Sequence, residues 1–275
     1  MRFVSFAQNH EDVPLWRLFQ GQPDGFYLDV GASGPDASVT TAFYNRGWTG
    51  LNLEPEPLLF ATLCAARPRD TNLLLAASDK PGTLTLFTDP DAGLAGLSTV
   101  VASQAELSRS AGFRAVPVAV PADTLASVCR RHVKRPVDFL KIDVEGHERE
   151  VIAGADWAKF RPRVVVVEAT EPMCPTPSHH GWEPLLFAAD YKLALFDGLN
   201  RFYVRAEEPE LLERLSYPAC VFDDFVPARH QQDLDRLGEE YAALRKDRDE
   251  VWWQLHHMRL RAEAAEAELA RLRGR

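Results

Sequence analysis

Short apolar runs alternate with helix-compatible segments through the first 170 residues, and this alternation limits the possible folds more than any other feature. Each run is rich in Leu, Ile, Val or aromatic residues and is closed by a charged or turn residue. Strands that alternate with helices predict a parallel α/β sheet with helices on both faces. The predicted strands are FYLDV (26–30), GLNLEP (50–55), LLLAAS (73–78), DFLKID (138–143) and RVVVVEA (163–169).

Three segments depart from this alternation. Residues 83–88, TLTLFT, interrupt the order and predict an extra strand or hairpin. Residues 191–205 hold two alternating runs around Asp-Gly-Leu-Asn, which predict an antiparallel hairpin. Residues 172–181 carry three prolines and are therefore predicted to be a loop after the fifth strand. The predicted helices cover residues 39–47, 57–68, 122–133 and 147–160.

Composition excludes several classes of function. The 275 residues are 46% apolar, which is ample for one large core. The net charge is −9, and an acidic chain does not recruit nucleic acid through phosphate contacts. The four cysteines lack C-x-x-C spacing, which favours reduced thiols over a zinc site or redox pair. With no secretory signal and no apolar run of about 18 residues, a cytoplasmic protein without a transmembrane segment is expected.

Residues 231–275 follow a seven-residue repeat, and only Arg248 interrupts its apolar seam. Nearly six heptads dense in Glu and Arg predict a coiled coil that joins copies of the chain through residues 234–272. The alternative is one amphipathic helix that lies back on the domain, but a strict 3.5-residue repeat favours the narrow seam of self-association. The a positions are Leu234, Tyr241, Arg248, Leu255, Ala262 and Leu269, and the d positions are Leu237, Leu244, Val251, Met258, Ala265 and Leu272.

This change of pattern predicts three parts of the chain. Residues 1–205 form the α/β domain, and residues 231–275 form the coiled coil. Residues 206–230 are mixed in character and contain three prolines, so they are predicted to link the two. The coiled coil would assemble protomers or set a distance between the domain and a partner.

A loop of small residues follows the first strand, in the segment DVGASG. Gly31 and Gly34 would let the backbone turn sharply and approach a ligand closely. Such a loop at the carboxyl end of a sheet suits an adenosine-type cofactor, whereas a simple tight turn is the alternative. The spacing is G-x-x-G and lacks the third glycine of the dinucleotide fingerprint, which disfavours a nicotinamide-dependent oxidoreductase.

The next two strands end in residues that suit a nucleoside. Glu54 lies at the end of the second strand, where an acidic side chain can accept hydrogen bonds from ribose hydroxyls, although alone it would be a solvated strand end. Ser78 and Asp79 follow the third strand, where small side chains suit a flat ring. The alternative there is a plain turn, since Asp-Lys-Pro-Gly is strong turn chemistry.

Carboxylates gather where the fourth and fifth strands end, in KIDVEGHE and VVVVEAT. Ligands of open α/β sheets bind at this edge, so Asp143, Glu145 and Glu168 are predicted to share one crevice. They could bind Mg or Mn through oxygen, with Asp143 and Glu168 as ligands, or one could act as a general base. First-turn charge on the following helix would explain Glu148 and Glu150, but less easily Asp143 and Glu168.

Other side chains are candidates for catalysis or acceptor binding beside these carboxylates. His147 is a rival general base because of its intrinsic pKa. His179, His180 and Trp182 lie on the proline-rich loop, which could cover an acceptor, with the Trp face as a sugar platform. A surface loop with incidental histidines is the alternative. A polar cluster before the first strand, predicted to be a flap or helix cap beside the pocket, comprises Gln8, Asn9, Glu11 and Asp12.

The set DVGASG, LEPEP, AASD, FLKIDVEGHEREVIAGA and VVVVEAT resembles the FkbM-type methyltransferases, which use S-adenosylmethionine. The resemblance covers residues 3–205, and KIDVEGHE is its most specific part. It implies a Rossmann-like seven-stranded methyltransferase sheet and methyl transfer to oxygen, commonly a sugar hydroxyl. The segments SFAQNHEDVPLWRLF and DGLNRFYV look like a branch associated with bacterial surface-polysaccharide synthesis.

The resemblance also implies roles for single residues. Asp143 and Glu145 would face the acceptor, and Asp143 would contact the cofactor as well. Because a sulfonium methyl is already a good electrophile, the enzyme would mainly align the acceptor oxygen. Asp143 is the first candidate for base or metal ligand, followed by Glu145 and Glu168. The implied cofactor contacts are Asp29, Gly31, Ser33 and Gly34 at the methionine part, Glu54 at the ribose, and Ser78 and Asp79 near the adenine.

A second hypothesis is a binding protein that keeps the cofactor pocket, has lost catalysis and works through its coiled coil. The carboxylates argue against it, because acids crowded at one pocket are costly unless they are used.

Overall fold

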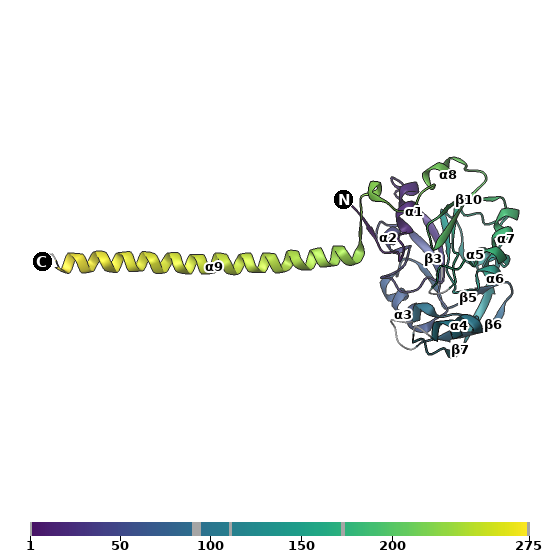
Figure 1. Ribbon diagram of the computed structural model, residues 1–275, viewed down its shortest axis with the longest axis horizontal. Coiled ribbons are helices and arrows are strands. Elements are labelled where there is room, and N and C mark those ends of the chain that lie inside the picture. The colour runs from purple at the N-terminus through teal and green to yellow at the C-terminus, as the bar shows by residue number, and fades with distance from the viewer. Residues whose placement is uncertain (1, 90–94, 110–111, 172–173, 274–275) are drawn as a thin grey trace. The chain divides into compact units, whose positions relative to one another are not determined.

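The computed structural model describes residues 2–89, 95–109, 112–171 and 174–273 (Figure 1). The chain divides into two units, Met1–Phe225 and Val226–Arg275. The first unit holds a seven-stranded sheet in the order β10-β11-β9-β8-β2-β3-β4. Its strands are β2 (Phe26–Val30), β3 (Thr49–Leu53), β4 (Thr71–Leu73), β8 (Phe139–Ile142), β9 (Val164–Glu168), β10 (Tyr191–Phe196) and β11 (Asn200–Arg205).

The strand directions match the two sequence patterns. Strands β4, β3, β2, β8 and β9 run parallel, which confirms the parallel sheet. Strands β10 and β11 form the expected antiparallel hairpin, with Tyr191 opposite Arg205. Strand β11 is also antiparallel to β9, so this hairpin closes one side of the sheet. The carboxyl ends of β2, β3, β8 and β9 therefore meet at one edge.

Helices cover both faces of this sheet because successive strand residues point to opposite sides. On β8, Leu140 and Ile142 pack with one set of helices, whereas Phe139 packs with the other set. The first set is α5 (Leu125–His132), α6 (Glu148–Ala153) and α7 (Glu183–Ala188). The second set is α1 (Asp12–Phe19), α2 (Thr41–Tyr44) and α8 (Glu210–Arg214).

A three-stranded sheet of β5 (Ala76–Ser78), β7 (Val116–Thr124) and β6 (Gly82–Thr88) lies beside the main one. The expected extra strand at 83–88 is β6, which pairs antiparallel with β7. The predicted strand 73–78 is divided, because β4 ends at Leu73 in the main sheet while β5 pairs with β7. Short elements near this sheet are η1 (Ala95–Leu97) and α4 (Ala102–Ser108).

The helices begin and end differently from the prediction. The helix expected at 122–133 begins only at Leu125, because the preceding residues extend β7. The Thr124 hydroxyl then accepts a hydrogen bond from the Ser127 N–H at 3.1 Å and caps α5. The helices predicted at 39–47 and 147–160 shorten to α2 and α6. The helix predicted at 57–68 is α3 (Pro57–Ala66).

The segment predicted as a linker, residues 206–230, mostly belongs to the first unit. Leu211 and Leu215 are buried in the core beside α1. The Arg17 Nε atom pairs with Asp223 Oδ1 at 2.8 Å, which ties the end of this segment to the same helix. Despite its three prolines, this segment therefore packs against the core of the first unit. Its remaining elements are η4 (Val221–Asp223) and β12 (Phe225–Pro227), and the chain starts with β1 (Phe3–Ser5).

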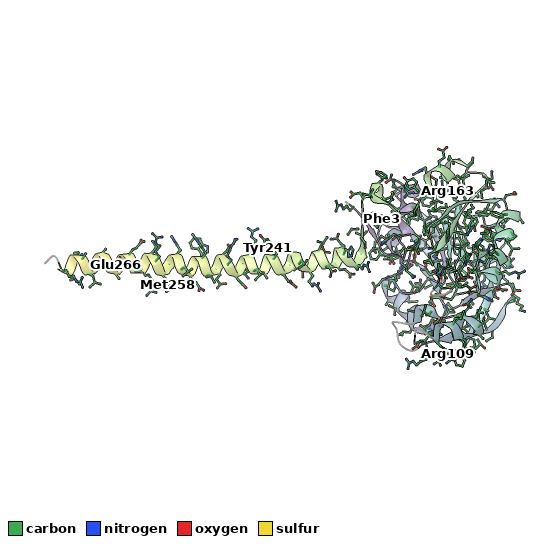
Figure 2. All side chains as sticks on the ribbon, in the orientation of Figure 1. Phe3, Arg109, Arg163, Tyr241, Met258 and Glu266 are labelled. Atoms are coloured by element: carbon green, nitrogen blue, oxygen red, sulfur yellow. The ribbon has the colours of Figure 1, made fainter. Side chains whose placement is uncertain are left out.

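The second unit is dominated by one continuous helix, α9 (Ala228–Arg273) (Figure 1). Its apolar seam is exposed, as the projecting side chains of Tyr241 and Met258 illustrate (Figure 2). The expected helix is therefore present, whereas its assembly into a coiled coil stays a prediction. Within the described residues, no helix is long and apolar enough to cross a lipid bilayer.

Candidate active site

Gly31 allows the backbones at the ends of β2 and β8 to pack closely against each other. It has φ +78°, and a Cβ atom there would lie 1.7 Å from the Asp143 carbonyl oxygen. Gly34 is different, because a Cβ atom at this position would meet only the Leu59 side chain at 3.8 Å. Protein packing thus requires glycine at position 31 but not at 34, where the space opens into the site.

Asp29 anchors the segment after the glycine loop. It is buried, and its Oδ2 atom accepts hydrogen bonds from the hydroxyls of Ser38 at 3.0 Å and Thr40 at 2.8 Å. Burial raises the pKa of Asp29, and the buried Arg67, which bonds to the Thr40 hydroxyl, acts in the opposite direction. The carboxylate therefore holds the loop that forms one wall of the site.

Glu54 is buried between two backbone donors, so it is not a solvated strand end. Its Oε2 atom accepts the Ser33 N–H at 2.7 Å, and its Oε1 atom accepts the Glu56 N–H at 2.8 Å. Burial raises the pKa of Glu54 to about 7. Each carboxylate oxygen keeps a lone pair, so Glu54 can still accept hydrogen bonds from a diol.

Glu54 lies at the wall of a pocket, here called the nucleoside pocket. The rest of the wall is largely apolar, as is usual for small-molecule sites, and polar groups gather at Asp143, Glu145 and His147. An apolar slot next to an acidic side chain suits a flat base joined to a ribose. The apolar lining residues are Val30, Leu53, Pro55, Leu59, Leu75, Ala76, Ala77, Leu86, Val100 and Val144.

Ser78 and Asp79, which were predicted near the adenine, are not part of this lining. Ser78 is buried, and its hydroxyl lies 3.1 Å from His147 Nε2 and 3.3 Å from Asp79 Oδ1. Strand β5 therefore presents Ala76 and Ala77 to the pocket and uses Ser78 to orient His147. Because the predicted strand 73–78 is divided into β4 and β5, Ser78 and Asp79 lie outside the lining in which they were expected.

His147 is held on the nucleoside side of the site. Its Nδ1 atom lies 3.5 Å from Glu150 Oε2, opposite the contact with Ser78. Burial lowers the pKa of His147. His147 lines the nucleoside pocket but not the broad cleft that adjoins it. This position argues against His147 as the base for an acceptor in that cleft.

The broad cleft shares Gly31, Ser33, Asp143 and Glu145 with the nucleoside pocket. It extends past the loop after β2 on one side and past the residues after β9 on the other. Asp143 and Glu145 thus lie where the two spaces meet. Lining residues include Gln8, Glu11, Asp29, Asp36, Ser38, Thr62, Lys141, Glu168, Thr170, Glu171, Cys174 and Pro175.

The structure brings Asp143, Glu145 and Glu168 together at this junction. One carboxylate oxygen from each lies within 4.8 Å of the others, an arrangement that could hold a metal ion. Burial, followed by the negative charges of neighbouring carboxylates, raises the pKa of both Glu145 and Glu168. Glu145 has φ +51°, so its backbone adopts an uncommon conformation to reach the cluster.

Lys141 is a member of the site that the sequence analysis missed. Its Nζ atom donates to Asp143 Oδ2 at 3.0 Å and to Asn200 Oδ1 at 2.8 Å. Burial opposes the charge, but Asp143, Glu11 and Glu168 raise the pKa of Lys141 above its ordinary value. The available signal was a lysine inside the apolar run FLKI, because lysine is almost never fully buried unless it is paired.

Other acidic side chains have mainly structural roles. Glu148 is buried, and its Oε1 atom accepts the Gly146 N–H at 3.0 Å and the Val144 N–H at 3.3 Å. It thus secures the turn between β8 and α6, as the helix-start alternative predicted. In the polar cluster near the N-terminus, Glu11 precedes α1 and lines the cleft together with Gln8.

The structure places His179, His180 and Trp182, which were predicted to bind the acceptor, away from the pocket and the cleft. Trp182 is 2% exposed and packs in the core, with its ring centroid 6.0 Å from that of Tyr203. His179 is also buried, in η3 (His179–Gly181), and the tilted ring of His180 has its centroid 4.1 Å from that of His179. None of the three lines the pocket or the cleft, and Thr170, Glu171, Cys174 and Pro175 form that wall instead.

Comparison with known protein families decides the assignment. The family model described as "Methyltransferase FkbM domain" matches residues 21–193. The chain belongs to this family. The cofactor of this FkbM methyltransferase is S-adenosylmethionine, and the residues present fit it. Glu54 can accept the ribose hydroxyls, the apolar slot suits the adenine, and the carboxylates at the junction suit a positively charged sulfonium.

Two solved structures show similarity over most of the domain. One is a TehB-like SAM-dependent methyltransferase from Corynebacterium glutamicum ATCC 13032 Kitasato, with TM-score 0.38 and 10% identity over 70% of this chain and 87% of that chain. The other is the Methanococcus jannaschii fibrillarin pre-rRNA processing protein, with TM-score 0.35 and 14% identity over 67% of each chain. No curated protein matches this FkbM methyltransferase significantly.

Proposed function

We propose that this FkbM methyltransferase transfers the methyl group of S-adenosylmethionine to a sugar hydroxyl of a glycan or sugar intermediate in bacterial surface-polysaccharide synthesis. The observation that carries the proposal is the carboxylate cluster at the junction of the nucleoside pocket and the broad cleft. A hydroxyl is a poor nucleophile until its proton has an acceptor, and carboxylates at this point supply one.

The chemical step follows from this geometry. The acceptor oxygen attacks the methyl carbon while the carbon–sulfur bond breaks, and its electron pair stays on sulfur. The products are a methyl ether and S-adenosylhomocysteine, and the hydroxyl proton passes to a carboxylate. Asp143 is the first candidate for this base, because it lines both the nucleoside pocket and the broad cleft and pairs with the Lys141 ammonium group beside Glu145 and Glu168. Alignment of the acceptor supplies much of the rate, since the sulfonium needs no activation.

A divalent cation is a second use for the same cluster. Asp143, Glu145 and Glu168 offer three hard oxygen ligands of the kind that Mg²⁺ and Mn²⁺ prefer. Lys141 already brings one positive charge to these acids, so bound cation and lysine would compete for Asp143. Calorimetric titration with each metal, in the presence of S-adenosylhomocysteine, separates the two uses.

The experiment for the proposal is a transfer assay with methyl-labelled S-adenosylmethionine and a panel of sugars and oligosaccharides. Mass spectrometry of the product should show one added methyl, and its NMR spectrum should place the methyl on oxygen. Asp143→Asn should bind S-adenosylhomocysteine but transfer little label. A methyl on nitrogen or carbon would contradict the proposed chemistry.

The exposed apolar seam of α9 supports a second candidate, a non-catalytic cofactor-binding scaffold whose coiled coil recruits or spaces partners. Such a protein would bind S-adenosylhomocysteine as the enzyme does but would methylate no acceptor in the panel. Both candidates include the assembly of copies through residues 234–272.

A further inference from the structure

The seam of α9 needs a partner to be covered. Among its residues, Tyr241, Leu244 and Met258 have 63%, 67% and 66% of their surface exposed. A helix of 46 residues gains most of its stability from packing of its apolar face, which is not packed in the single chain. The exposed members of the seam are Leu234, Leu237, Tyr241, Leu244, Val251, Leu255, Met258, Leu269 and Leu272.

Charges that flank the seam indicate how two copies would pair. In a parallel, in-register pair, each g residue faces the e residue five positions later in the other copy. Three of these contacts join opposite charges, and the other two join no like charges. The opposite pairs are Glu240 with Arg245, Arg261 with Glu266, and Glu268 with Arg273, and the remaining pairs are Asp247 with Trp252 and Gln254 with Arg259.

An antiparallel pair with the same overlap is disfavoured. In that arrangement g residues face g residues and e residues face e residues. Glu240 would then face Glu268, and Arg245 would face Arg259, so two contacts would be repulsive and only one, Asp247 with Arg261, would be attractive. If the antiparallel pair is shifted by one heptad, the two repulsive contacts disappear, but one heptad of each seam then has no partner.

Arg248, the one charged residue in the seam, favours the same arrangement. In a parallel, in-register pair, the side chain at an a position packs against the matching a position of the other copy. It therefore also lies beside the g residue that comes just before that matching position. Arg248 would therefore lie beside Asp247 of the other copy, whereas in the antiparallel overlap it would lie opposite Met258. In the single chain, Arg248 forms an ion pair with the exposed Asp249 at 2.6 Å, and an exposed pair of this kind contributes little.

We propose that α9 of two copies forms a parallel, in-register coiled coil over residues 234–272. A long arginine side chain at an a position can reach the rim of a two-stranded coil, which favours two strands. The layer of Arg248 and Asp247 favours this register, because a shift of one heptad leaves the guanidinium of one copy beside Gln254, without a carboxylate. This inference does not rest on the acceptor proposed above.

The test exchanges charges in the full chain and measures the dimer dissociation constant by sedimentation equilibrium. Glu240→Arg and Arg245→Glu should each weaken the dimer about tenfold, because two attractive contacts per dimer become repulsive. The double variant should return to the wild-type value. Glu239→Arg is the matched control, since its f position points away from the seam and should change nothing.

An antiparallel pair gives the opposite sign. Either single substitution would then relieve a repulsion and strengthen the dimer, which would overturn the inference. A chain that stays monomeric, or that forms trimers, would overturn it equally. A second measurement uses Leu237→Cys under oxidation: copies should crosslink to each other above the wild-type background, whereas an antiparallel pair would not bring the two thiols together.

Discussion

Lys141 and Asp143, two residues apart at the end of β8, form an ion pair with 3.0 Å between Nζ and Oδ2. The lysine side chain is 3% exposed and the aspartate 31%, so the cation is buried while the carboxylate reaches the site. The charges of Glu11, just before α1, and Glu168, at the end of β9, also act on this lysine. The pair therefore places a buried positive charge behind the carboxylate cluster at the junction of the nucleoside pocket and the cleft.

Removal of the Lys141 ammonium group should slow catalysis. Lys141→Met removes a positive charge that lowers the pKa values of Glu145 and Glu168, so these pKa values rise further in the variant. We expect kcat to fall roughly 100-fold and the acid limb of its pH profile to move to higher pH. Lys192→Met, at an exposed lysine of β10, is the control. An unchanged profile would show that Lys141 does not set the ionisation of the base.

The glycine loop offers a matched pair of substitutions. Gly31→Ala should lower Tm strongly, because its Cβ atom would overlap the Asp143 carbonyl and its φ is positive. Gly34→Ala should leave Tm close to that of the wild type, but should weaken S-adenosylhomocysteine binding if this space holds the cofactor. Thermal unfolding and calorimetry distinguish these effects. Equal Tm values for the two variants would contradict the close approach of β2 and β8.

Glu54 should contribute to cofactor affinity through its charge. Glu54→Gln replaces one acceptor oxygen by an amide that cannot accept from a backbone N–H or a ribose hydroxyl. The dissociation constant of S-adenosylhomocysteine should rise by roughly 10–100-fold, the range for hydrogen bonds to charged groups. Calorimetric titration measures it, with the exposed Glu106→Gln as control. Unchanged affinity would place the ribose elsewhere.

The buried acids make the domain more stable at mildly acidic pH. Burial raises the pKa of Glu148 from 4.5 to about 7, so the folded state binds more protons than the unfolded state between these values. Stability should therefore fall as the pH rises from 4.5 to 7. Glu148→Gln keeps an acceptor oxygen without the charge, and should raise Tm by roughly 3 °C at pH 8 and leave it unchanged at pH 4.5. A lower Tm at pH 8 would contradict this.

The negative charge of the cleft predicts which acceptor sugars the enzyme methylates most efficiently. Among its described lining residues, Lys141 is the only lysine or arginine, whereas the acids include Asp36 and Glu171 in addition to the central cluster. Uncharged sugars and amino sugars should therefore give higher kcat/KM than uronic acids or sugar phosphates of similar size. Glu171→Gln should reduce this preference. Equal rates for neutral and anionic sugars would show that the acceptor does not enter the cleft.

Buried strands were the most predictable part of the fold. The apolar runs at 26–30 and 163–169 are covered on both faces, so burial alone defines them as strands. The run at 73–78 was not predictable as two strands, because the pairing of β5 depends on β7, about 40 residues further along the chain. The start of α5 could have been found, since Thr124 is a common helix cap.

The site was predictable where strand ends carry charge. Asp143, Glu145 and Glu168 meet because parallel strands deliver their ends to one edge. Lys141 lies inside a strand, and its contacts depend on Asn200 of β11, which periodicity does not reveal. Trp182 looked accessible because it follows a proline-rich loop, but loop composition does not show that its ring is in the core.

A single-turnover assay with labelled S-adenosylmethionine and a neutral oligosaccharide tests the proposed role of the carboxylate cluster most directly. Wild type and Asp143→Asn should bind S-adenosylhomocysteine with similar affinity, and only the wild type should transfer the methyl to a hydroxyl oxygen at an appreciable rate. Transfer by Asp143→Asn at the wild-type rate would contradict the assignment of Asp143 as the proton acceptor.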